Sequence, residues 1–277
     1  TLRWLEIAQN QKITVTMLVP VQYQRLMSEE LFDSFNLSAM AIKYCTSAPF
    51  SADLKSEVLR RMPGGLIEIY SMTEGGVVCL LACHEFPEKL HTVGRPAPGS
   101  ELKVLDDDDQ PVPEGSPGNL IGRSQTMMMG YKNQPDKTRE GYWVNPLNGE
   151  LWQRMGDIGR IDKDGFVELV GRAKDMIISG GFNIYPSDLE VELEKDERVI
   201  EAAVIGIFSE QWGETPYGFV RLAENTDKNI VKDILYSVNA RLGKTQRLSG
   251  LEAISEMPRS HIGKLLKTEL RQRARVS

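Results

Sequence analysis

Residues Tyr70 to Gly76, YSMTEGG, form the segment of this sequence best suited to chemistry. They follow the apolar run LIEI and precede VVCLL, so they lie where a predicted strand gives way to a loop. Thr73 offers a hydroxyl group and a loop amide to a phosphate, and Glu74 is a hard oxygen ligand of the kind that Mg²⁺ prefers beside nucleotide phosphates. Taken alone, the segment fits a strand-to-turn junction with an exposed acid equally well.

Three further residues carry groups that suit a nucleotide. The Tyr70 ring offers a flat apolar face for adenine, although a core aromatic that ends a strand explains it as well. Asp157, in RMGDIGR, can accept two hydrogen bonds from a ribose diol, beside a glycine that lets a ligand approach the backbone. Arg172, in VGRAKD, is a planar cation suited to ribose and phosphate oxygens. In isolation, Asp157 would be read as a turn residue and Arg172 as a surface residue.

Two candidates lie near the C-terminal end of the sequence. Lys264 ends PRSHIGK, a glycine-containing loop from which an ammonium group can reach across a cleft. There it would neutralise the negative charge of a phosphate, although most lysines are solvated surface groups. Gly181, in SGGFN, would let a thin ligand chain pass close to the backbone, and a tight turn explains it as well.

Composition excludes several classes of function. The chain has 277 residues, 41% of them hydrophobic and 26% charged, which is typical of a globular protein of one or two domains. A formal net charge of -6 argues against nucleic acid and anionic membrane as partners. No apolar run reaches membrane-spanning length, the N-terminus does not resemble a secretory signal, and three cysteines suit a reducing compartment. We therefore expect a cytoplasmic protein without a membrane span.

Two groups of residues invite a metal interpretation that their spacing does not support. Cys79 and Cys83, followed by His84, lack the further ligand that a zinc site needs, and VVCLLAC is more simply a buried strand. The four aspartates at 106–109 lack the spacing of a calcium loop and predict a solvated turn between strands.

Around these candidates, the sequence predicts an α/β protein in three parts. Residues 1–91 alternate helical and extended segments, as in an α/β domain with a largely parallel sheet, and ITVTMLVP reads as a buried strand. Residues 92–173 contain short extended pieces separated by turns, among them ELWQR and IGRID, which predicts a β-rich, barrel-like subdomain of the same domain. Residues 174–277, in the order β-α-β-β-α-β-α, predict a small α+β domain with a hinge near 174–175.

In order and spacing, these segments resemble the adenylate-forming (AMP-binding) superfamily of acyl-CoA synthetases, aryl-CoA ligases, luciferases and peptide-synthetase adenylation domains. The resemblance rests on YSMTEGG, RMGDIGR, GRAKDMIISGGFNIYP and PRSHIGKLLK, and also on APFS at 48–51 and GYKNQPDKT at 130–138. It spans essentially the whole chain.

The resemblance implies a role for each candidate residue. Thr73 would contact the phosphate, Glu74 would hold Mg²⁺, and Asp157 and Arg172 would bind the ribose end of the nucleotide. Lys264 would be the catalytic lysine. Lys174 would lie at the hinge of a mobile C-terminal domain, and Gly181 would line the path of the coenzyme A thiol.

The implied activity is that of an ATP-dependent acid–thiol ligase, with ATP, Mg²⁺ and coenzyme A as its nucleotide, metal and acceptor. Its partner would be a small-molecule carboxylic acid. The pocket for this acid would be lined in part by Cys45–Pro49 and Gly75–Val78, whose small or apolar side chains suit aliphatic and aromatic acids alike. Delivery of the acyl group to a carrier protein and a non-catalytic role in binding a nucleotide or a partner stay open as alternatives. A homo-oligomer is equally open.

Two departures from the family pattern bear on these expectations. Ser71 stands where the family usually has glycine, which should narrow the loop slightly. The Ser/Thr/Gly-rich phosphate loop that the family carries upstream is not found in the sequence. We therefore expect the chain to be the C-terminal portion of a longer enzyme, and to be inactive or nearly so by itself.

Overall fold

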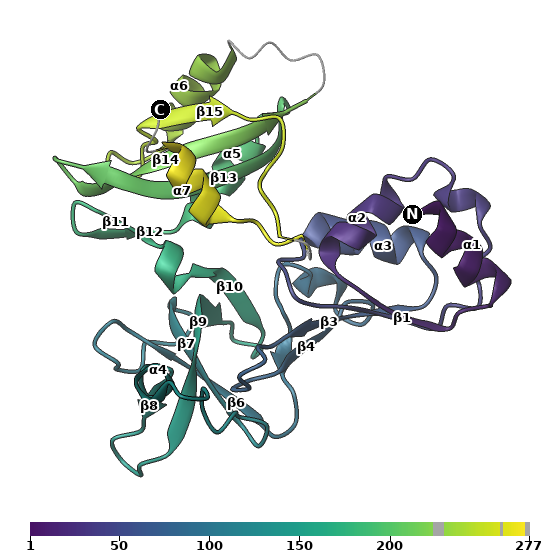
Figure 1. Ribbon diagram of the computed structural model, residues 1–277, viewed down its shortest axis with the longest axis horizontal. Helices are drawn as coiled ribbons and strands as arrows, with labels where there is room; N and C mark the ends of the chain where they lie inside the picture. The colour runs from purple at the N-terminus through teal and green to yellow at the C-terminus, as the bar shows by residue number, and fades with distance from the viewer. Residues whose placement is uncertain (224–229, 261–262, 275–277) are drawn as a thin grey trace. The chain divides into compact units, whose positions relative to one another are not determined.

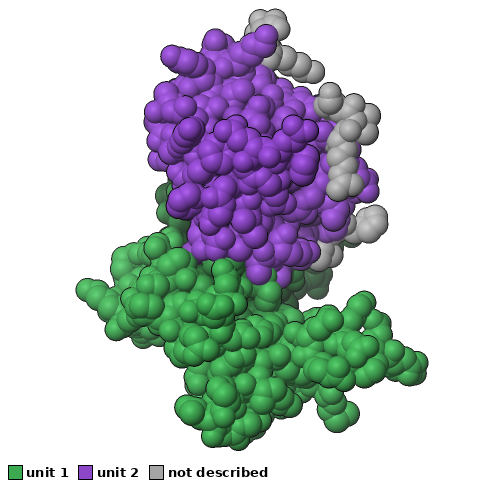
Figure 2. All heavy atoms as spheres, turned by 90° about the vertical axis from the view of Figure 1, so that its left-hand side faces the viewer, with its two compact units in different colours: residues 1–169 green, residues 170–277 purple. Residues whose placement is uncertain are grey.

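The computed structural model describes residues 1–223, 230–260 and 263–274, and divides the chain into two compact units, residues 1–169 and 170–277 (Figures 1 and 2). Each unit has hydrophobic clusters of its own. The boundary falls within strand β10 (Val167–Arg172), close to the predicted hinge at 174–175, which stays a prediction.

The first unit opens with a mixed five-stranded sheet in the order β1-β2-β3-β4-β5. Strands β1, β2 and β3 are parallel, as predicted, whereas β4 pairs with β3 and β5 in antiparallel fashion. Helices α1, α2 and α3 contribute Leu5, Tyr23 and Val58 to the same buried cluster as Leu66 and Leu81 of the sheet. The elements are α1 (Leu2–Asn10), β1 (Val15–Leu18), α2 (Pro20–Met27), the 3-10 turn η1 (Phe32–Ser34), β2 (Ile42–Cys45), α3 (Ala52–Arg61), β3 (Gly65–Tyr70), β4 (Cys79–Ala82), η2 (Pro87–Lys89) and β5 (Arg95–Pro96).

Local signals in the sequence explain where these helices begin. Ser51 is the N-cap of α3, and its hydroxyl accepts a hydrogen bond from the Leu54 amide at 3.3 Å. Pro20 occupies the first turn of α2, where its missing N–H costs nothing. Thr1 is at the N-cap position of α1 but makes no side-chain capping bond.

Strand β1 is not the buried strand that the sequence predicts. Val15 is 52% exposed and Met17 58%, while Leu18 is buried. Val15 and Met17 lie on one face of β1 and Leu18 on the other, and only Leu18 joins the cluster that the helices share.

The second sheet of this unit is the predicted β-rich part, with the order β10-β9-β7-β6 and β8 paired to β9. The predicted strands ELWQR and IGRID are in fact one strand, β9, which carries Asp157 inside it rather than in a turn. The β9–β7 register accommodates this because it shifts between Asn119 and Ile121, a β-bulge. The elements are β6 (Ser100–Leu105), β7 (Gly118–Ser124), α4 (Pro135–Glu140), β8 (Tyr142–Val144), β9 (Leu151–Ile161) and β10.

The second unit is the predicted α+β fold, with one strand, β12, that the sequence did not indicate. Its sheet has the order β12-β11-β14-β13, and β15 pairs with β14. Helices α5 and α6 share one buried cluster with Val204, whereas α7 shares another with the neighbouring Ala203 and Ile205, so the helices cover opposite faces. The elements are η3 (Ala173–Asp175), β11 (Ile177–Ser179), β12 (Phe182–Ile184), α5 (Pro186–Glu194), β13 (Val199–Ser209), β14 (Gly213–Leu222), α6 (Val231–Arg241), β15 (Gly250–Ala253) and α7 (Lys267–Ala274).

Strand β13 ends the strand order, and helix α5 supplies the hydrogen-bond partners that its outer edge would otherwise lack. The Ala202 amide donates to the Glu194 carboxylate at 3.1 Å, and the Val204 amide donates to the Glu190 carboxylate at 2.8 Å. Burial raises the pKa of Glu194. Two glutamates one helical turn apart therefore bind two amides that are two residues apart on β13 and point to the same outer edge of the strand.

A buried ion pair lies between α3 and β3. The Lys55 ammonium is 2.5 Å from the Glu68 carboxylate and donates hydrogen bonds to the carbonyls of Leu90 and Thr92. Burial outweighs the attraction of Lys55 and raises the pKa of Glu68 to about 7. The carboxylate is therefore costly to keep charged in this position.

We expect Glu68→Gln to remove a pH dependence from the free energy of unfolding. Because the folded-state pKa of Glu68 is raised from 4.5 to about 7, the native chain binds more protons than the unfolded chain between these values. The free energy of unfolding of the wild type should therefore fall by about 1–3 kcal/mol relative to that of the variant as pH rises through this window. Urea unfolding of both proteins at a series of pH values measures the difference between their free energies of unfolding. Titrating groups that behave alike in both proteins do not contribute to this difference. A difference that does not vary with pH contradicts the assignment.

Candidate active site

The loop after β3 is shaped by close contacts with the segment 126–128. The Gly75 amide donates to the Met72 carbonyl at 3.1 Å, and the Met128 amide donates to the Glu74 carbonyl at 2.8 Å. Gly75 has φ +89°, and a Cβ there would lie 2.6 Å from the Met127 Cα. Gly76 has φ +84°, and its Cβ would lie 2.7 Å from the Met155 sulfur. Both glycines are thus required by the packing of the protein itself.

Glu74 is held by a residue to which the sequence analysis gave no role. The Tyr131 hydroxyl donates to a Glu74 carboxylate oxygen at 2.8 Å, and this bond raises the pKa of Tyr131. The Tyr131 amide in turn donates to the Thr138 hydroxyl at 2.9 Å, which fixes the start of the segment GYKNQPDKT. In the sequence, this segment shows only a resemblance to the family, because spacing gives no sign of which acid its tyrosine contacts.

Asp157 and Tyr70 meet from two different sheets. The Tyr70 hydroxyl, at the end of β3, donates to an Asp157 carboxylate oxygen at 2.7 Å, and Asp157 is only 8% exposed. Gly156, with φ +69°, allows the irregular backbone of β9 just before the acid. Unit 1 therefore gathers Tyr70, Thr73, Glu74 and Asp157 around one loop, with Thr73 exposed. The hydroxyls and carboxylates of this set fit a nucleotide and its Mg²⁺.

Three predicted residues belong to the second unit and are described within it. Arg172 is exposed at the end of β10. Gly180 and Gly181, with φ +58° and +83°, form the two-residue turn between β11 and β12, so the tight-turn interpretation is correct. Space is open around Gly181, since no atom lies within 4 Å of a Cβ built there. Lys264 is exposed, and its amide donates to the Ser260 hydroxyl at 3.1 Å.

Cys79 lies in strand β4 and the aspartates at 106–109 lie in an exposed turn, as the sequence predicts. Cys79 and Cys83 are buried free thiols, and burial raises the pKa of Cys79 to about 12 and that of Cys83 to about 11. Asp106 accepts the amides of Asp108 and Gln110 within its own turn. Across the described ranges, no group of three or more His, Cys, Asp or Glu side chains could hold a metal ion. None of the described helices is long and apolar enough to cross a membrane.

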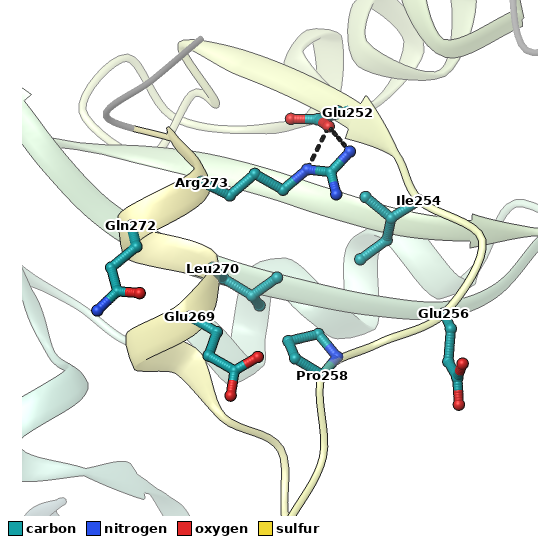
Figure 3. Close-up of a pocket in the computed structure, with 8 residues that line it drawn as sticks. All are labelled: Glu252, Ile254, Glu256, Pro258, Glu269, Leu270, Gln272 and Arg273. Carbon is teal, nitrogen blue, oxygen red and sulfur yellow. Dashed lines mark hydrogen bonds and ion pairs between the residues drawn. The ribbon is translucent and has the colours of Figure 1, made fainter.

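An open hollow in the second unit contains none of the predicted site residues (Figure 3). Ile254, Pro258 and Leu270 supply apolar surface, and the carboxylates of Glu256 and Glu269 lie around it. A further acid, Glu252, is paired with Arg273 of α7 at 2.6 Å.

This chain belongs to the AMP-binding enzyme family. The family model of the AMP-binding enzyme matches residues 1–132 of the sequence, and the family model of the AMP-binding enzyme C-terminal domain matches residues 188–264. A feruloyl-CoA synthase of Amycolatopsis is 32% identical over 273 residues, which cover 97% of this chain and 53% of the relative. The chain thus spans about half the length of this curated relative.

Solved structures share the fold. The amide bond synthetase McbA of Marinactinospora thermotolerans is 27% identical with a TM-score of 0.86, over 98% of this chain and 54% of McbA. ATP-bound MatB of Rhodopseudomonas palustris is 27% identical with a TM-score of 0.83, over 98% of this chain and 52% of MatB. The predicted fold class and the predicted family are confirmed, whereas the roles of single residues stay predictions.

We expect Gly75→Ala to destabilise the chain more than Gly149→Ala. Both glycines have positive φ, so alanine costs about 1–2 kcal/mol of backbone strain at either position. Only at Gly75 does the added Cβ meet backbone atoms, at 2.6 Å, whereas Gly149 has nothing within 4 Å. Urea midpoints of the two variants give the comparison. Equal losses of stability contradict the close packing of the loop.

We expect Glu74→Gln to lower the pKa of Tyr131 toward its ordinary value. The substitution keeps an acceptor oxygen for the tyrosine hydroxyl but removes the negative charge that opposes its ionisation. Titration of ring-labelled tyrosines by NMR measures the change, and Glu150→Gln serves as a control acid. A Tyr131 pKa that is the same in the wild type and in Glu74→Gln shows that the two groups do not meet.

Proposed function

We propose that this chain carries part of the active site of an ATP-dependent acid–thiol ligase, an acyl- or aryl-CoA synthetase. One observation supports this most directly. Within an AMP-binding fold, two carboxylates beside the same loop, Glu74 and Asp157, each accept a hydrogen bond from a tyrosine hydroxyl. A carboxylate that is oriented before the ligand arrives loses less freedom on binding.

The proposed roles follow the chemistry of each side chain. Glu74 would hold Mg²⁺, whose positive charge would offset that of the phosphates, and Thr73 would donate to the phosphate. Asp157 would accept hydrogen bonds from the ribose, with Arg172 at the same end of the nucleotide. Tyr70 would present its ring to adenine while its hydroxyl orients Asp157.

The reaction would proceed in two steps. A carboxylate oxygen of the acid would attack the α-phosphorus of ATP, so that an O–P bond forms and the bond to pyrophosphate breaks. Lys264 would neutralise the charge that develops there. The second unit would then turn about Lys174, and the coenzyme A thiolate, passing Gly181, would attack the acyl carbon and release AMP.

The residues around the proposed acid site suit more than one class of carboxylic acid. Cys45, Gly75 and Val77 are buried and small or apolar, which suits an aliphatic or an aromatic acid. The named relative is a feruloyl-CoA synthase, whereas the structural neighbour McbA is an amide bond synthetase. That neighbour favours a second candidate function, in which the same acyl-adenylate is delivered to an acceptor other than coenzyme A, such as an amine.

We expect Lys264→Ala to impair the first step and to spare the second. Pyrophosphate exchange, measured with a panel of carboxylic acids on the full-length product of the gene, should fall about 10²–10³-fold. Thioester formation from supplied acyl-adenylate should stay close to that of the wild type. An equal loss in both half-reactions would refute the role of Lys264.

The same assay, applied to this chain alone, separates catalysis from binding. We expect little or no exchange by residues 1–277, together with activity of the full-length product. Product analysis with coenzyme A, amines and a phosphopantetheinylated carrier as acceptors separates the two candidate functions.

A further inference from the structure

Lys264 is carried by a short loop whose two arms are joined by backbone hydrogen bonds. We define the lysine loop as Pro258–Ser260 and Gly263–Leu266, since residues 261 and 262 lie outside the described ranges. The Leu266 amide donates to the Pro258 carbonyl and the Ser260 amide to the Lys264 carbonyl, each at 2.8 Å. The two arms thus form a narrow antiparallel pair, and the Lys264 side chain on the second arm is exposed.

Arg259, on the first arm, joins this loop to the sheet. Its guanidinium donates to the Gly263 carbonyl at 2.7 Å and also forms an ion pair with Glu201 of β13. One planar cation therefore contacts the residue just before Lys264 and an acid on a rigid strand. Glu201 is also paired with Arg221 of β14, at 3.5 Å, so the acid is itself held in place.

Lys267, after the second arm, makes a similar connection. Its ammonium donates to the Glu190 carboxylate at 2.7 Å and to the Val204 carbonyl at 3.0 Å, and it is the first residue of α7. Glu190 is the acid that also accepts the Val204 amide. Both ends of the lysine loop are thus bound to β13 or to the helix that packs on it.

We propose that Arg259 is a positioning residue for Lys264. It fixes the backbone beside the lysine to β13, so that the ammonium is delivered from a rigid base. This inference rests on the proposed function, because it takes adenylation as the step that Lys264 assists. Two different nitrogens of the guanidinium meet the Gly263 carbonyl and the Glu201 carboxylate. The rigid plane of the guanidinium fixes the separation of these two donors, whereas an ammonium presents all its N–H groups from one atom on a flexible chain.

The first test measures the loop itself and needs no activity. In this chain, Arg259→Ala should raise the hydrogen-exchange rate of the Gly263 and Lys264 amides about tenfold, since a charged hydrogen bond and an ion pair that oppose local opening are removed. Arg259→Lys should give a smaller increase. Arg273→Ala is the matched control, because Arg273 also joins α7 to a strand through an acid, but that acid is Glu252 of β15 rather than Glu201 of β13 (Figure 3).

The second test measures catalysis in the full-length product. Arg259→Ala should lower pyrophosphate exchange about 10-fold or more, as expected for a misplaced catalytic group, with thioester formation from supplied acyl-adenylate unchanged. In a Lys264→Ala background, the same substitution should cause no further loss, because a residue that acts through the lysine has nothing left to position. Arg259→Lys should restore part of the exchange activity.

The outcomes separate this inference from the proposed function. If Lys264→Ala impairs adenylation but Arg259→Ala leaves it intact, the positioning role is wrong and the proposed function stands. If the loss caused by Arg259→Ala persists in the Lys264→Ala background, Arg259 acts by another route and the inference is overturned. If Lys264→Ala leaves adenylation intact, the assigned role of the lysine fails, and with it the catalytic part of the inference, whatever the exchange rates of the loop.

Discussion

The hydrogen bond from Tyr70 to Asp157 is the contact on which the candidate site depends. It joins the end of β3 in the mixed sheet to the interior of β9 in the β-rich sheet, across 87 residues of sequence. Asp157 can reach Tyr70 because β9 is irregular at Gly156, where the backbone takes a positive φ and the register with β7 shifts. A regular strand would send alternate side chains to fixed faces and would leave no such adjustment. The bulge thus brings the carboxylate of a strand residue to the candidate site.

Both compact units contain carboxylates that are held by a hydrogen-bond or ion-pair partner. Tyr131 orients Glu74 and Tyr70 orients Asp157 in the first unit, whereas in the second unit Glu190 and Glu201 bind Lys267 and Arg259. The first pair would serve the ligand and the second pair serves the loop that bears Lys264. Both ion pairs of the second unit are partly buried, and they fix the geometry of the loop by tying it to β13 and α5.

The buried pair of Lys55 and Glu68 shows the opposite balance. There the charges lie in the interior, and burial raises the pKa of Glu68 despite the lysine beside it. Lys55 also binds the carbonyls of Leu90 and Thr92, so the pair connects helix α3 and strand β3 to the chain that leads into β5. Such a pair costs free energy by its desolvation and contributes a fixed arrangement of the elements around it.

The sequence by itself determined the class of fold, the family and most of the elements, because caps, prolines and apolar periodicity are local signals, as Ser51 and Pro20 show. It also singled out Tyr70, Thr73, Glu74 and Asp157, which surround one loop in the first unit. Only the tertiary structure revealed Tyr131 as the partner of Glu74, Arg259 as the residue that ties the lysine loop to β13, and β9 as a single bulged strand. Each of these depends on which distant segments pack together, and neither spacing nor composition records that choice.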